Sequence, residues 1–224
     1  MSVWGTVPAW LAAVIAFFAS ILAIRQLRLA TKAQADQVQI ARANLMLAID
    51  KSYEDATMLN SRKAVRSLRN RAHATIEKQA HKDKTSDGKR KQIAEEFSAQ
   101  LDQLWSVARS IRDEDVDVAD SKQRIAHDRY SELMCLVNWM ETVGMLCKRN
   151  LLPTPDILDL YDQVIVPTLT NFKNHVDVRR REEPYPNPRF MENAYWLHEM
   201  AVTYQAQRDR TLPLDPAKSP TKWS

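Results

Sequence analysis

The stretch YSELMCLVNWMETVGMLCKRNLL (residues 130–152) holds the densest run of apolar side chains outside the N-terminus. Its apolar residues, from Leu133 to Cys147, would cover every side of a helix, which is the pattern of a helix enclosed on all sides. Gly144 indicates a close approach by a neighbouring helix, because glycine otherwise weakens a helix. Asn138 and Glu141 interrupt the run, so it is too polar to cross a membrane. The stretch predicts the central helix of a core.

Glycine and proline are rare on the N-terminal side of this helix. Between Pro8 and Pro153 there is no proline, and Gly88 and Gly144 are the only glycines. Folds built from strands and tight turns need these residues often. The sequence therefore predicts an all-α protein.

Three further segments repeat apolar residues three or four positions apart, as an amphipathic helix does. They are residues 93–111, 157–172 and 190–204. The second begins with the best helix-start signal of the chain, since Thr154 can cap a helix and Pro155 suits its first turn. Pro167 predicts a bend in this helix.

The N-terminal run VPAWLAAVIAFFASILAI (residues 7–24) precedes Arg25, the first charged residue. As a helix it spans about 27 Å, close to the roughly 30 Å of a bilayer core. A secretory signal would need basic residues before the run. A buried core helix would be shorter and more polar. The run predicts a transmembrane helix, with these two readings as alternatives.

Arg25, Arg28 and Lys32 follow the run at once. By the positive-inside rule we expect the N-terminus to lie outside and residues 25–224 in the cytoplasm, after a single pass of the membrane. The chain is then divided into a transmembrane anchor that contacts membrane lipid (1–24), a long juxtamembrane helix (25–61), a cytoplasmic helical bundle (62–210) and a disordered tail (211–224).

Residues 62–91 carry eleven Lys and Arg against three acids, whereas acids exceed bases in the rest of the chain. One interpretation is a solvated helical hairpin around a loop at residues 85–88. Another is attraction to anionic lipid headgroups. Nucleic acid is the weakest, because no aromatic residue lies between Lys63 and Lys91 to stack on bases. The candidate lipid contacts are Arg62, Lys63, Arg66, Arg69 and Arg71.

Asn138 and Glu141 lie three positions apart, so they share a face of the predicted central helix. A buried carboxylate has to be paired, hydrogen-bonded or neutralised. Arg149 and Arg179–Arg181 are the nearest basic candidates. The pair is thus a candidate buried polar centre, either an ion pair that sets helix register or a contact with a ligand or partner.

Recognisable catalytic and metal-binding motifs are missing, among them phosphate loops, nucleophile elbows and HExxH. Cys135 and Cys147 are interpreted as reduced core thiols, and no Cys/His cluster has zinc spacing. Residues 113–117 (DEDVD) begin like a calcium loop but lack its glycine and its final glutamate. His127, His175 and His198 are isolated and indicate surface or packing histidines. We expect no enzymatic activity, no catalytic or metal-binding residue and no cofactor.

Four short motifs carry a resemblance to a known family: Leu136–Glu141 (LVNWME), Leu151–Pro153 (LLP), Leu160–Tyr161 and Arg179–Arg180. Together they resemble an uncharacterised bacterial family, a domain of unknown function found in single-span, membrane-anchored helical proteins. The resemblance implies an N-terminal span, a long helix and a helical domain. Because such genes often lie in prophages and mobile elements, it also favours a role in phage conflict.

These observations predict a membrane-anchored, non-enzymatic helical scaffold, sensor or effector of the bacterial inner membrane, with a protein partner or self-association. One alternative is a phage-defence membrane effector that self-associates. Another is a membrane-tethered enzyme whose active site matches no known motif.

Overall fold

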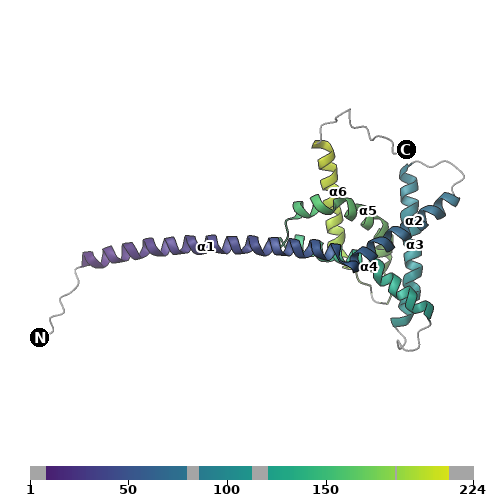
Figure 1. Cartoon of the computed structure of the whole chain (residues 1–224), viewed down its shortest axis with the longest axis horizontal. Helices are drawn as coiled ribbons and strands as arrows, with labels where there is room; N and C mark the ends of the chain where they lie inside the picture. The colour runs from purple at the N-terminus through teal and green to yellow at the C-terminus, as the bar shows by residue number, and fades with distance from the viewer. Residues whose placement is uncertain (1–8, 80–85, 113–120, 185, 212–224) are drawn as a thin grey trace. The chain divides into compact units, whose positions relative to one another are not determined.

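A computed structural model of the chain describes residues 9–79, 86–112, 121–184 and 186–211. These residues form six helices and no strand, which confirms the predicted all-α class (Figure 1). The helices are α1 (Ala9–Glu54), α2 (Ala56–Gln79), α3 (Ser86–Arg112), α4 (Ser121–Lys148), α5 (Thr154–Arg180) and α6 (Glu192–Thr211). The predicted disordered tail, apart from Thr211, and the acidic stretch at residues 113–117 lie outside the described residues.

The chain divides into two units, one ending at Ala48 and one beginning at Ile49. In the first unit, the described side chains of α1 start at Leu22, and almost all of them are exposed. The large apolar ones among them are Leu22, Ile24, Leu27, Leu29, Val38, Ile40 and Leu47. The second unit holds the rest of the helices and the whole buried core.

The predicted membrane location is contradicted. Over the part of the chain that the structure describes, no helix is both long and apolar enough to cross a bilayer. Most of the run at residues 7–24 lies outside the described side chains. The described side chains of α1 begin at Leu22 and include Arg25, Arg28 and Lys32, and charges at this density are costly in hydrocarbon. The single-pass location in a bacterial inner membrane, with its outside N-terminus and cytoplasmic domain, is therefore corrected.

Asp55 separates α1 from α2. Its Oδ2 accepts a hydrogen bond from the backbone N–H of Thr57 at 3.0 Å, which caps the start of α2. This bond is the main reason why the pKa of Asp55 lies below its usual value. The helix predicted over residues 25–61 is thus divided between α1 and α2, and the aspartate was the available signal.

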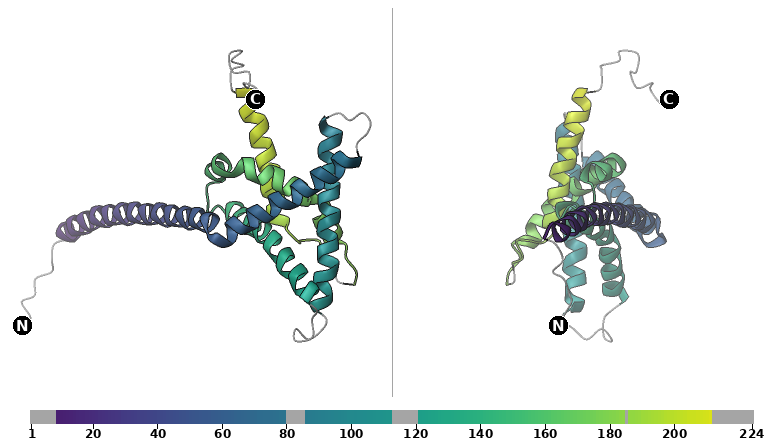
Figure 2. Two further views of the ribbon diagram at one scale, coloured as in Figure 1. Left: turned by 45° about the vertical axis from the view of Figure 1, so that its right-hand side comes forward. Right: turned by 90° about the vertical axis from the view of Figure 1, so that its left-hand side faces the viewer.

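α4 is the central helix, as predicted from residues 130–152. It packs against α2, α3, α6 and, less extensively, α5, and Figure 2 shows α2 lying across α3 and α4. Its buried side chains cover much of its circumference, whereas Ser131, Asn138 and Thr142 are exposed on the remaining side. The buried ones are Ala126, Tyr130, Leu133, Met134, Leu136, Val137, Trp139, Met140, Val143 and Cys147. The hydroxyl of Ser61, itself buried in α2, accepts a hydrogen bond from the backbone N–H of Leu136 at 3.0 Å.

Gly144 lets α6 approach α4 closely, which confirms its predicted role. A Cβ atom added there would overlap the backbone carbonyl of Asn193 and lie 3.3 Å from Cβ of Leu197. Glycine is required here because a side chain has no room. Its backbone conformation is helical and would suit other residues.

α5 follows the predicted bounds with one change at its start. Pro153 is the N-cap residue, with no side-chain capping bond, so Thr154 begins the helix instead of capping it. Pro155 lies in the first turn and Pro167 lies inside the helix, both as predicted, and the helix ends at Arg180. The loop predicted at residues 85–88 is wrong for residues 86–88, which form the first turn of α3, and Thr85 lies outside the described residues.

Candidate anion-binding face

α2 has one apolar and one basic side. Its buried residues recur at helical spacing and are Met58, Val65, Leu68, Ala72 and Ile76. Lys63, Arg66, Arg69 and Arg71 lie on the other side and are exposed. These four residues are called the basic face of α2 below. The sequence predicted all four of them.

The basic face has no counter-charge among the described residues. None of its four side chains takes part in an ion pair or a side-chain hydrogen bond there. Glu77, the one acidic residue in the α2 sequence, is already engaged by Lys89 at 3.2 Å and by His73 at 3.4 Å. Four neighbouring cations without acids raise the local positive potential and attract anions.

Arg62 belongs to the same helix but has a different environment. It is partly buried, and its guanidinium lies over the Tyr53 ring at 4.3 Å from the centroid. Tyr53 in turn packs on Trp139 and Tyr161, with ring centroids 5.0 Å from each. The Nε atom of Arg62 is buried and has no hydrogen-bond partner among the described residues. Arg62 is therefore held against the core, unlike the four exposed cations.

A cleft of about 460 Å³ lies between α2 and α5. Arg62, Arg66, Arg69 and Asn70 line it from α2; Gln163, Thr168 and Asn171 line it from α5. Tyr53, Val65, Leu136, Val164 and Pro167 complete its surface, and no carboxylate lines it. It is called the α2–α5 cleft below.

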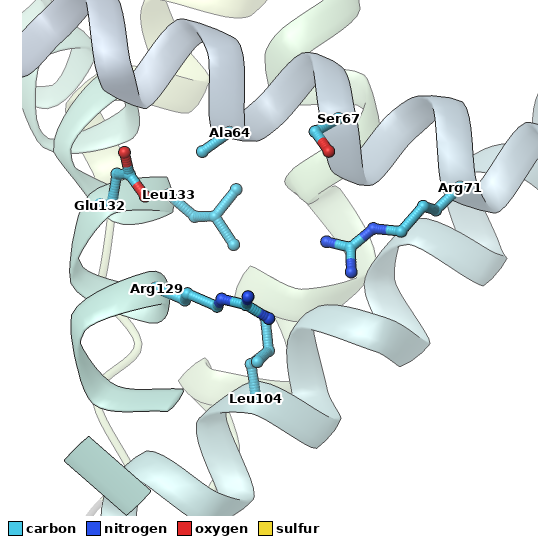
Figure 3. A pocket seen from close by; sticks show the side chains of 7 residues that line it. All are labelled: Ala64, Ser67, Arg71, Leu104, Arg129, Glu132 and Leu133. Carbon is cyan, nitrogen blue, oxygen red and sulfur yellow. The ribbon is translucent and has the colours of Figure 1, made fainter. Parts of the chain in front are cut away.

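A second cavity, of about 260 Å³, lies on the other flank of α2, against α3 and α4. Figure 3 shows the guanidinium groups of Arg71 and Arg129 pointing into this space, which the side chains of Leu104 and Leu133 also line. Glu132 also lines it, so a carboxylate is present here. The two cavities therefore differ in charge although both border the basic face.

The candidate polar centre of α4 is not a buried pair. Asn138 is exposed, which corrects the prediction, because its position on the helix faces away from the neighbouring helices. Glu141 is partly buried, and its carboxylate accepts hydrogen bonds from Asn193 Nδ2 and from the backbone N–H of Ala194, both at 2.7 Å. Glu141 therefore caps the start of α6.

The arginines expected near Glu141 have other partners. Arg179 pairs with Glu182 and lies over the Trp105 ring at 3.5 Å from its centroid. Arg180 donates from Nε to the backbone carbonyl of Phe190 at 2.9 Å. These residues hold the segment after α5 against the domain.

The sequence missed a buried polar network around His175, which it indicated only as a packing histidine. His175 is fully buried; its Nδ1 lies 2.5 Å from Asp102 Oδ1 and its Nε2 lies 3.1 Å from the Tyr130 hydroxyl. Since the carboxylate can only accept, Nδ1 carries the proton and Nε2 accepts from Tyr130. Burial lowers the pKa of His175 and raises the pKa of Tyr130 to about 12.

Both ring nitrogens of His175 are occupied by side chains of α3 and α4, so neither is open to a substrate. Within the described ranges, no three His, Cys, Asp or Glu side chains are grouped so that they could hold a metal ion. Within the described part of this unit, the basic face gathers four exposed cations on one helix with no acidic partner.

Comparison of the chain with protein-family models, with curated proteins and with solved structures gave no match. The resemblance carried by residues 136–141, 151–153, 160–161 and 179–180 therefore stays a prediction.

Proposed function

We propose that the protein is a non-enzymatic helical binding module, a scaffold or effector, that binds anionic lipid headgroups through the basic face of α2. One observation supports this most directly. Lys63, Arg66, Arg69 and Arg71 are exposed on one helix and have no acidic partner among the described residues. By contrast, Arg179 and Arg208 in the same unit are paired, with Glu182 and Asp162.

The chemistry of the exposed side of α2 favours lipid over other polyanions. A basic residue near an anionic bilayer surface contributes about 1 kcal/mol, so four contribute roughly 4 kcal/mol. Binding of single-stranded nucleic acid combines positive charge with aromatic stacking, and the α2 sequence contains no Phe, Tyr or Trp. A protein interface needs buried aromatic or apolar anchors, whereas Leu59 is the only exposed large apolar side chain among the described ones of α2.

The non-enzymatic part of the proposal is supported by the lack of recognisable catalytic motifs in the sequence and by the contacts of His175. Its two ring nitrogens are engaged by Asp102 and Tyr130, which is the arrangement of a structural network. The alternative roles, in phage defence or as an enzyme, stay predictions of the sequence.

The test is binding of the full chain to vesicles. Neutral phosphatidylcholine vesicles give the baseline, and vesicles with added phosphatidylserine give the charge-dependent excess. We expect this excess to fall as salt rises, because exposed charges are screened within about 8 Å at physiological ionic strength.

A matched pair of variants locates the contact. Lys63→Gln, Arg66→Gln and Arg71→Gln together should reduce the excess binding by roughly a hundredfold. The control replaces Lys122, Arg124 and Lys173, which are exposed on α4 and α5, and removes the same charge. The proposal fails if the two triple variants bind alike, or if the wild type does not distinguish acidic from neutral vesicles.

A further inference from the structure

We propose that the α2–α5 cleft is a specific binding site for a phosphate monoester. Arg66 and Arg69 of α2 would bind the phosphate from one wall, with Arg62 behind them, and polar side chains of α5 would bind it from the other wall. The inference rests on the proposed function, since the same helix presents both the basic face and the cleft. It names the chemical group that the cleft would recognise, whereas the proposed contact of the basic face with lipid depends on charge alone.

The first argument is the charge inside the cleft. Three guanidinium groups line it and no carboxylate does. Two nearby acids have other partners: Asp162 pairs with Arg208 at 3.0 Å, and Asp50 accepts from Tyr161 at 2.8 Å. Glu54, which follows Tyr53 in the sequence, is exposed and does not line the cleft. A recess lined by one sign of charge with apolar walls concentrates the field and selects the more highly charged anion. A phosphate monoester carries close to two negative charges at neutral pH, and a diester carries one.

The second argument is the set of hydrogen-bond donors. Guanidinium groups bind phosphate oxygens in a two-pronged geometry that an ammonium group does not offer. The Arg62 guanidinium is already fixed over the Tyr53 ring, so little side-chain freedom is lost when a ligand binds. Across the cleft, Thr168 and Asn171 are buried residues whose side chains can donate, and Gln163 lies at its exposed edge.

The third argument is the contrast between the α2–α5 cleft and the other cavities beside α2. The α2–α5 cleft holds about 460 Å³, within the range of about 300–1,000 Å³ typical of small-ligand sites. The cavity with Arg71 and Arg129 holds about 260 Å³ and includes Glu132, whose carboxylate repels an anion (Figure 3). A third hollow, of about 420 Å³, is lined by residues of α2 alone, among them Lys63, Arg66 and Arg71. Of the three, the α2–α5 cleft is the one in which arginines on one wall face hydrogen-bond donors on the other.

Phosphate monoesters occur both at lipid headgroups and free in solution, so the experiment has two arms. In one, glycerol 3-phosphate is the free probe and glycerophosphocholine, a diester, is its control, with binding to the full chain followed by calorimetry. In the other, phosphatidic acid vesicles are compared with phosphatidylglycerol vesicles adjusted to equal surface charge. We expect binding of glycerol 3-phosphate and a preference for phosphatidic acid.

Two Gln→Glu substitutions distinguish binding in the cleft from binding to the basic face. Gln163→Glu places a carboxylate at the edge of the cleft, and Gln103→Glu makes the same change at an exposed position of α3. Gln163→Glu should weaken binding of glycerol 3-phosphate about tenfold by charge repulsion, while Gln103→Glu should leave it unchanged. Asn70→Asp, which adds the same charge from the α2 wall, should act like Gln163→Glu. Binding to phosphatidylglycerol should change by less than about twofold in Gln163→Glu and Gln103→Glu, because the four exposed cations remain and neither glutamine lies on α2.

The outcomes distinguish this inference from the proposed function. If acidic vesicles bind but show no preference for the monoester, or if Gln163→Glu and Gln103→Glu behave alike, the cleft is not a phosphate site and the proposed function stands. If glycerol 3-phosphate binds in a Gln163-dependent manner but neither vesicle type does, the site stands with a soluble ligand and the proposed function fails.

Discussion

Glu141 in α4 accepts a hydrogen bond from the backbone N–H of Ala194, with Oε2 2.7 Å from the nitrogen, at the first turn of α6. Its other oxygen accepts from Asn193 Nδ2 at the same distance. The first N–H groups of a helix have no partner within the helix, and a negative charge there also complements the helix dipole. A carboxylate from one helix thus completes the start of another.

We expect Glu141→Ala to lower the free energy of unfolding by about 1–2 kcal/mol, the usual cost of losing a helix cap. A buried ion pair broken on one side would cost about 3–5 kcal/mol instead. Glu141→Gln should cost less than Glu141→Ala, because its carbonyl still accepts one bond. Urea unfolding measures both, with Glu132→Ala on the same helix as control. An unchanged midpoint for Glu141→Ala would show that the cap contributes nothing.

Gly144→Ala should destabilise the protein by about 1–3 kcal/mol, the cost of forcing an extra methyl into a packed contact. The added Cβ would overlap the backbone carbonyl of Asn193, which is not free to move like a flexible side chain. At an exposed helical position the gain of alanine is favourable, so Ser131→Ala in the same helix serves as the control. A Gly144→Ala variant as stable as the wild type would contradict the close packing of α4 and α6.

Local patterns in the sequence were enough to predict α4, the proline positions of α5 and the close approach at Gly144. Each depends on neighbouring residues, because apolar spacing and backbone requirements are read within a few turns. The break at Asp55 was missed although an aspartate is a local helix-start signal. The exposure of Asn138 was missed because it depends on which face of a helix meets its neighbours.

Only the α2 wall of the candidate site could be predicted from the sequence. The sequence placed the basic face on α2, since a charge run is local. It could not place Gln163 and Asn171 opposite Arg66, because that contact joins segments far apart in the chain. For the same reason the Asp102–His175 contact, which joins residues 73 positions apart, was not foreseen.

The two thiols should differ in reactivity, although the sequence predicted both as core residues. Cys147 is buried, and burial raises its pKa to about 11; Cys135 is only partly buried. Because the thiolate is the nucleophile, iodoacetamide at about pH 8 should alkylate Cys135 well before Cys147. Mass spectrometry of timed samples measures this, and both should react at similar rates in urea. Equal rates in the folded protein would contradict the burial of Cys147.

The His175 network should make stability fall between about pH 7 and about pH 5. Burial is the main cause that lowers the pKa of His175 in the folded state, against the opposing effect of Asp102. The unfolded chain takes up a proton near the ordinary value of about 6.5, whereas the folded chain does so only at lower pH. The unfolded state therefore binds more protons in this window, and the free energy of unfolding decreases as pH falls.

His175→Gln should be less stable than the wild type at about pH 8, because it loses the bond to Asp102 or to Tyr130, and should lose part of this pH dependence. Some dependence should remain, since burial also lowers the pKa of His198. His127→Gln, at an exposed position, should follow the wild-type curve. Urea unfolding at several pH values in this window measures the three proteins. If His175 instead formed a charged pair with Asp102, the wild type would become more stable as pH falls, and that result would overturn the neutral network.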